Sequence, residues 1–228
     1  MSDQDTSPRP RLRIAIIGAG IAGLAAALTL RKRHDVTIYE RNLPSTPEAA
    51  GGLGLGPNGT KMCKELGLAK EDIGGVSLKG FKTWNKEGKL IKEVEVEFEG
   101  AYGRADGIHS KTRGSVIDPG HPPPVPSGLS AYRFTMPYDV VQRVLADVPN
   151  PLHYDGGVYA NMIVADDGTG RSMMMYPCRD LKVVYFAAGV PDSALEEETA
   201  YSWRLDGDPR GMMKYFHDFP PWVRSIMK

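Results

Sequence analysis

This chain of 228 residues contains only two cysteines and five histidines. The two cysteines, Cys63 and Cys178, lie far apart and outside any C-x-x-C spacing, which excludes a disulfide framework and a cysteine-based zinc site. The five histidines form no close pair with metal-ligand spacing. The sequence contains no Ser/His/Asp arrangement that would indicate nucleophilic catalysis. The cysteine usage favours a reducing compartment, and we expect a cytoplasmic protein.

Net charge is also missing, because 28 Lys and Arg residues balance 28 Asp and Glu residues. No global field therefore favours nucleic acid or an anionic membrane. An uncharged stretch covers residues 14–30, but it is shorter than the roughly 20 residues of a membrane span and it contains three phased glycines. We expect no membrane span, and specific binding must come from a local site.

The most informative stretch that is present runs from residue 11 to residue 41. Residues 14–17 are an apolar run typical of a buried parallel strand, and they lead directly into residues 18–23, whose sequence matches G-x-G-x-x-G. Residues 24–33 are rich in Ala and Leu and end in three cations, which predicts a helix. Residues 36–40 predict a second strand with an acid at its end.

The spacing of these glycines has a chemical reason. Gly18 permits a tight turn, Gly20 lets a pyrophosphate approach the backbone, and Gly23 lets the helix pack closely on the strand. The first N–H groups of the helix then face the phosphates. Glu40 lies 17 residues after Gly23, where its carboxylate can accept a hydrogen bond from an adenosine ribose. The stretch therefore predicts a dinucleotide site.

A second glycine-rich segment, residues 48–59, precedes a helix ending in Leu-Gly-Leu. Together with residues 18–23 and the pair Glu40-Arg41, it resembles the N-terminus of class A FAD-dependent monooxygenases, especially the salicylate hydroxylase-like aromatic hydroxylases. The resemblance implies an FAD site that includes Glu40 and Arg41. It also implies that Gly51 and Gly52 lie beside the flavin.

Residues 105–113 are similar to the second fingerprint of that family, G-A-D-G-x-x-S-x-x-R, except that Arg104 replaces its first glycine. The resemblance assigns Asp106 and Arg113 to the region of the FAD pyrophosphate and the nicotinamide cofactor. The family's preceding apolar strand and its later G-D motif have no counterpart here. We therefore expect a member shortened near residues 103–105 and at the C-terminus, with weak or no FAD retention.

The proline-rich residues 119–127 predict a domain boundary. The expected fold class is α/β, with a disordered lead-in at 1–10, a Rossmann-like FAD-binding domain at 11–124 and a substrate-binding domain with a mixed or antiparallel sheet at 125–228. Period-two alternation at residues 91–99 predicts an antiparallel strand with one wet face. We also expect strands at 129–136, 172–177 and 181–189, helices at 58–66 and 139–148, and a helical C-terminal segment interrupted by two prolines at 220–221.

Arg133 and Tyr176 match positions that the family uses on its substrate sheet. The resemblance implies that Arg133 orients a phenolate or stabilises negative charge; the alternative is a surface arginine in a salt bridge. Tyr176 is expected to line the core or the pocket. The family uses NAD(P)H and O₂ with FAD to hydroxylate an electron-rich aromatic small molecule. Another flavin-linked oxidoreductase and an inactive FAD- or ADP-binding relative remain alternatives, and no motif specifies the oligomeric state.

Overall fold

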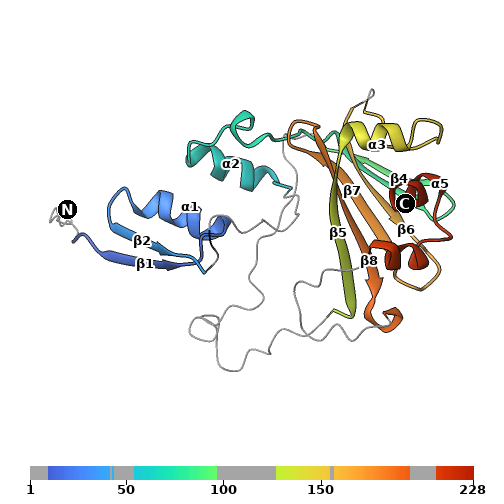
Figure 1. The fold of residues 1–228 in the computed structure, drawn as a ribbon. Coiled ribbons are helices and arrows are strands. Elements are labelled where there is room, and N and C mark those ends of the chain that lie inside the picture. Colours follow the sequence, from blue (N-terminus) through green and yellow to red (C-terminus); the bar gives the residue numbers. More distant parts are fainter. Residues whose placement is uncertain (1–9, 42, 44–53, 97–126, 155–156, 196–208) are drawn as a thin grey trace, which may run out of the picture. The chain divides into compact units, whose positions relative to one another are not determined.

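The computed structural model describes residues 10–41, 43, 54–96, 127–154, 157–195 and 209–228. The chain forms two compact units (Figure 1). Unit 1 comprises Met1–Ala49 and Met62–Leu68, and unit 2 comprises Ala50–Lys61 and Ala69–Lys228.

Unit 1 is built on a β-α-β element formed by β1 (Arg13–Ile17), α1 (Ile21–Leu30) and β2 (Asp35–Tyr39). The two strands are parallel and in register, as the apolar run at residues 14–17 predicts. The helix starts and ends three residues earlier than the expected 24–33. Its C-cap is Arg31, whose N–H donates to the carbonyl of Ala27 (3.0 Å), so the three cations follow the helix instead of forming its last turn.

Helix α2 (Pro57–Glu65) starts at a proline, which suits the first helical position because that residue needs no intrahelical N–H bond. The helix begins one residue before the expected start at 58, so Asn58 lies inside the first turn. The end of the helix is as predicted: Gly67 has φ of +78°, and the N–H of Leu68 donates to the carbonyl of Cys63 (2.9 Å). A short 3-10 turn, η1 (Glu71–Ile73), follows.

Unit 2 contains a six-stranded mixed sheet with the order β4-β3-β6-β7-β8-β5. Strands β3 and β6 are parallel, and the other neighbouring pairs are antiparallel. The mixed sheet of the expected fold class is confirmed. Its strands are β3 (Gly80–Asn85), β4 (Leu90–Glu95), β5 (Leu129–Pro137), β6 (Tyr159–Val164), β7 (Ser172–Cys178) and β8 (Val183–Pro191).

Strands β3 and β6, which form the parallel pair of the sheet, were not assigned from the sequence. Strand β4 was expected to have one wet face, but all six of its residues are exposed because it lies at the edge of the sheet. Since β3 and β4 pair into this sheet, residues 80–95 belong to unit 2, whereas the sequence placed them in the FAD-binding domain at 11–124. The functional division into domains stays a prediction.

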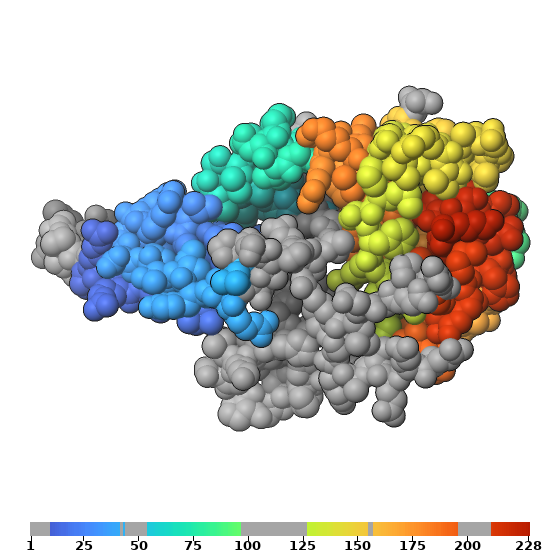
Figure 2. Space-filling model, in the orientation of Figure 1, coloured from blue at the N-terminus to red at the C-terminus, as the bar shows by residue number. Residues whose placement is uncertain are grey.

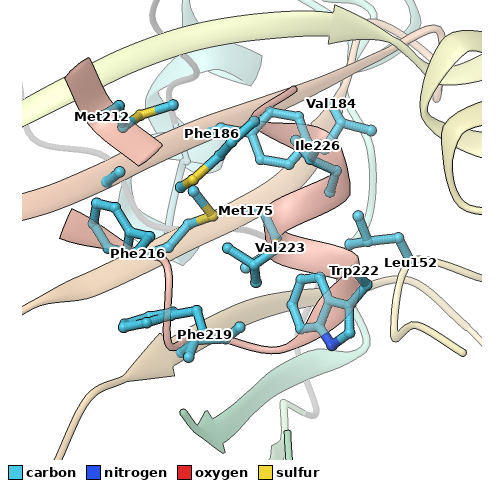
Figure 3. Close-up of a cluster of buried hydrophobic side chains, with 14 of the residues drawn as sticks. Leu152, Met175, Val184, Phe186, Met212, Phe216, Phe219, Trp222, Val223 and Ile226 are labelled. Carbon is cyan, nitrogen blue, oxygen red and sulfur yellow. The ribbon is translucent and has the colours of Figure 1, made fainter. Parts of the chain in front are cut away.

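One face of the sheet is covered by helices α3 (Tyr138–Val144), α4 (Pro209–Met212) and α5 (Pro221–Ile226) together with the turn η4 (Met213–Tyr215). Figure 2 shows α3 beside the C-terminal segment, in agreement with the contact between α3 and α5. The C-terminal segment is helical on both sides of an interruption, as predicted, and Pro221 is the first residue of α5. In Figure 3, Phe216, Trp222 and Val223 point toward Met175 and Phe186 of the sheet, which are fully buried.

A charge cluster fastens the C-terminal segment to two hairpin turns of the same sheet. Arg171, whose side chain is 12% exposed, forms ion pairs with Asp167 (2.8 Å) and Asp218 (2.7 Å). Lys86, in the β3–β4 turn, pairs with Asp167 at 3.0 Å and with Asp218 at 3.7 Å. Hydrogen bonds from the Thr169 hydroxyl and then from Lys86 lower the pKa of Asp167, and the hydrogen bond from Arg171 lowers the pKa of Asp218, so both carboxyl groups stay ionised at neutral pH.

Candidate cofactor and substrate sites

The glycine turn of unit 1 has the geometry that its sequence predicts. Gly18 has φ of +100°, and its N–H donates to the carbonyl of Tyr39 (2.7 Å), which joins the turn to the end of β2. A Cβ at Gly23 would overlap the carbonyl oxygen of Gly18 and would lie 3.3 Å from the side chain of Ile16. The third glycine is therefore needed because α1 and β1 pack too closely for a side chain.

The space in front of α1 is suited to a pyrophosphate. Gly20 is the N-cap residue of α1 and has an extended backbone. A Cβ added there would meet no atom within 4 Å, so a ligand can approach the backbone at this position. The first N–H groups of a helix have no intrahelical acceptor, and the first turn of α1 carries no acidic side chain. This end of the helix therefore presents donors and partial positive charge, and no carboxylate in its own first turn competes for them.

Glu40 lies directly beside this turn. Its Oε2 atom accepts a hydrogen bond from the N–H of Ala19 at 2.7 Å, which brings the acid at the end of β2 to the glycine turn across 21 residues of sequence. The arrangement brings together the two features that the sequence predicts for an ADP site: free N–H donors at the start of α1 and a carboxylate at the end of β2. The exposed Arg41 follows Glu40 immediately. The roles of both residues in cofactor binding stay predictions.

The other predicted cofactor residues lie outside the residues that the structure describes. These are Gly51, Gly52, Asp106 and Arg113. The internal shortening expected near residues 103–105 falls in the same range.

Arg133 lies on the face of the unit 2 sheet opposite the helices. On β5 the even-numbered residues Tyr132, Phe134 and Met136 pack against the core, so the alternating side chain of Arg133 points the other way and is exposed. Helices α3, α4 and α5 pack on the core side, and we call the opposite side the open face, although Tyr185 on that side is only 6% exposed. Arg133 pairs in register with Ala187 of β8, which in turn pairs with Met174 of β7.

Two tyrosines accompany Arg133 on the open face. Tyr176 of β7 pairs with Tyr185 of β8, and their rings lie 5.0 Å apart. Burial raises the pKa of both phenols, and the positive charge of Arg133 opposes this shift at each. The sheet therefore brings together one cation and two phenols that stay protonated at neutral pH. Such a group can donate hydrogen bonds to an anionic oxygen of a ligand.

Tyr185 was not selected from the sequence, although residues 181–189 were expected to form a strand. The signal that could have identified Tyr185 is its alternation with the core residues Val184 and Phe186 on either side. The role of Arg133 in catalysis stays a prediction.

The described parts of the chain show neither a metal site nor a membrane-spanning helix. No group of three or more His, Cys, Asp or Glu side chains there is arranged to hold a metal ion. None of the helices in those parts has the length and apolar character needed to cross a bilayer.

Comparison with known proteins connects this geometry to a family. A family model described as FAD dependent oxidoreductase matches residues 13–84, the segment that contains the glycine turn and Glu40. The chain is also 21% identical to the FAD-dependent monooxygenase ntnJ of Nectria sp. over 276 residues, which cover 96% of this chain and 63% of that protein. This chain is a relative of the FAD-dependent monooxygenases.

The relatives of this chain also include an aromatic hydroxylase. The salicylate hydroxylase of Pseudomonas putida is 39% identical over 72 residues, which cover 31% of this chain and 16% of that protein. The crystal structure of CtdE in complex with FAD and a substrate has the same fold, with a TM-score of 0.71 at 18% identity over 96% of this chain and 66% of that one. The chain thus spans less than two thirds of the length of ntnJ and of CtdE.

Proposed function

We propose that this chain acts as an FAD-dependent monooxygenase that hydroxylates an aromatic, phenol-like small molecule with NAD(P)H and O₂. Bound FAD would supply the redox and oxygen chemistry. The protein would bind the cofactor, orient the substrate and shield the reacting atoms from water. The donors in front of α1 and the Glu40 carboxylate would hold the ADP half of the cofactor. The aromatic hydroxylase among the relatives supports a ring as substrate.

The observation that carries the substrate half of this proposal is the group formed by Arg133, Tyr176 and Tyr185 on the open face. An ionised phenol carries its charge on one oxygen, and an arginine keeps its charge at any physiological pH. Two neighbouring phenol O–H groups add hydrogen-bond donors without adding charge. The arrangement is suited to hold a phenolate, whose ring carbons are more electron-rich than those of the neutral phenol.

The test uses the full chain reconstituted with FAD. We expect NADH- or NADPH-dependent oxygen uptake that requires a phenol and yields a hydroxylated product in mass spectrometry. Arg133→Gln should raise KM for an acidic phenol at least tenfold, because a charged hydrogen bond contributes about 1.5–3 kcal/mol. Oxygen uptake with hydrogen peroxide as the sole product, or an unchanged KM in the variant, would contradict the proposal.

A second candidate is a relative that binds the ADP half of FAD but has lost catalysis. It is favoured by the alignment with ntnJ, which extends over 276 residues although it covers 96% of a 228-residue chain, so the relative has additional residues within the aligned region. Under this candidate we expect weak or no FAD retention. Purified protein that is yellow, with stoichiometric flavin, would reject it.

A further inference from the structure

A single row of residues crosses the open face from Arg133 toward the far side of the sheet. Strand pairing aligns the row in register, so its members lie side by side on neighbouring strands. The row consists of Arg133 (β5), Ala187 (β8), Met174 (β7), Met162 (β6) and Thr83 (β3). Between the cation and the threonine it is entirely apolar. We call it the cross-sheet row.

The apolar part of the cross-sheet row leads to a hollow of about 400 Å³. Its sheet side is formed by Met162 and Val164 of β6 and Ser172 of β7, and the turn between these strands supplies the rest. The remaining lining residues are Ala165, Asp166, Gly168, Gly170 and Arg171. Gly168 and Gly170 both have positive φ, and the absence of their side chains leaves the turn side of the hollow open.

The length of the row sets the size of a ligand that would use both ends. Three strand spacings separate Arg133 from Met162, which amounts to about 14 Å between their Cα atoms. A phenolate held at Arg133 extends across only part of that length. The side chain of Met174, between the two ends, is 42% exposed although it is apolar.

We propose that the substrate is a phenol that carries a linear apolar substituent, which lies across Ala187 and Met174 and ends in the hollow beside Met162. This inference rests on the proposed function and adds the substrate class. Methionine side chains suit the role because they are flexible and polarisable, so they adapt to a chain without one fixed shape. Covering them would also remove exposed apolar surface from water.

The experiment is a calorimetric titration of the full chain, in the presence of FAD, with phenol and with 4-ethyl-, 4-butyl- and 4-hexylphenol. Each methylene that leaves water should lower Kd about threefold to fourfold. Met162→Trp fills the hollow and should weaken the binding of 4-hexylphenol at least tenfold, while Kd for phenol changes less than twofold. Ile91→Trp is the matched control, because Ile91 is half-exposed on the edge strand β4 and is neither a member of the row nor a lining residue of the hollow.

The outcomes separate this inference from the proposed function. If phenol binds, and Arg133→Gln weakens the binding of all four ligands by the same factor, the binding of the phenol oxygen at Arg133 is supported, as the proposed function requires. A Kd independent of chain length, or a slope that Met162→Trp leaves unchanged, would then overturn the elongated substrate alone. If none of the four ligands binds, the phenol site itself fails. A loss of 4-hexylphenol binding in Ile91→Trp would also overturn the placement in the hollow.

Discussion

Two glycines of the G-x-G-x-x-G turn, Gly20 and Gly23, should respond differently to the same added methyl group. At Gly20 the backbone is extended, with φ of −67° and ψ of 173°, which alanine adopts readily, and an added Cβ would meet no protein atom within 4 Å. Gly20→Ala should therefore change the free energy of unfolding by about 0.5 kcal/mol or less. The methyl group would, however, occupy the space through which a pyrophosphate must approach the backbone.

The effect of Gly20→Ala on ligand binding should accordingly be large. A hydrogen bond from a backbone N–H to a charged phosphate oxygen contributes about 1.5–3 kcal/mol, and displacement of the phosphate would lose at least one such bond. We expect ADP to bind about 30- to 150-fold more weakly, which corresponds to about 2–3 kcal/mol. Isothermal titration calorimetry with ADP measures this directly, because ADP represents the half of FAD that this turn would hold.

Gly23→Ala should mainly reduce stability, whereas Gly20→Ala should mainly reduce ADP affinity. Its Cβ would overlap the carbonyl oxygen of Gly18, and a backbone atom cannot move aside as the end of a flexible side chain can. Overpacking of this kind costs about 1–3 kcal/mol, offset by roughly 1 kcal/mol because alanine is a better helix former than glycine. We expect the β1–α1–β2 element to lose stability in thermal unfolding and in amide hydrogen exchange.

A matched control is Gly211→Ala in α4 of unit 2, where an added Cβ also meets no atom within 4 Å. It should leave ADP affinity unchanged. The reasoning is refuted if Gly20→Ala binds ADP as the wild type does, or if Gly23→Ala is as stable as the wild type. Failure of the wild-type chain to bind ADP would refute the assignment of the cradle itself.

Three further predictions concern the sheet of unit 2. Arg171→Met should destabilise the chain by about 2–3 kcal/mol in urea unfolding, because Asp218 loses its nearest cation and Asp167 loses one of its two; an unchanged midpoint would contradict this. Folding lowers the pKa of both carboxyl groups, so the stability they add is present above their ordinary pKa of 3.8 and should be lost as pH falls below it, which acid titration of the melting temperature checks. Gly88→Ala should lower the melting temperature, since Gly88 has φ of +82° and its Cβ would lie 3.3 Å from Pro220.

Local patterns in the sequence predicted the elements that depend on near neighbours. The apolar run at 14–17, the glycine spacing and the acid at Glu40 define a β-turn-α-β unit within about 28 residues, and the structure confirms it, with helix ends shifted by three residues. The stop at Gly67 was equally predictable, because a residue with positive φ after a helix favours glycine. Each of these signals lies within a single continuous segment of fewer than 30 residues.

Strands β3 and β6 needed information from far along the chain. Strand β6 contains Asn161, which is 1% exposed, and its polar side chain interrupts the apolar run that identifies a buried strand. Asn161 is accommodated because its side-chain oxygen accepts a hydrogen bond from the indole of Trp84, 77 residues earlier, at 3.0 Å. No local pattern contains that partner. The membership of β3 and β4 in the second sheet was hidden for the same reason.

The sequence by itself determined the β-turn-α-β unit with an acid at the end of its second strand, because the glycine spacing and the apolar runs specify the backbone there. It also identified Arg133 and Tyr176 one at a time, through family resemblance. Only the tertiary structure decided that they share a face with Tyr185 and that an apolar row runs from Arg133 to a hollow. The physical reason is strand register, since the pairing of β5, β8, β7 and β6 determines which side chains become neighbours.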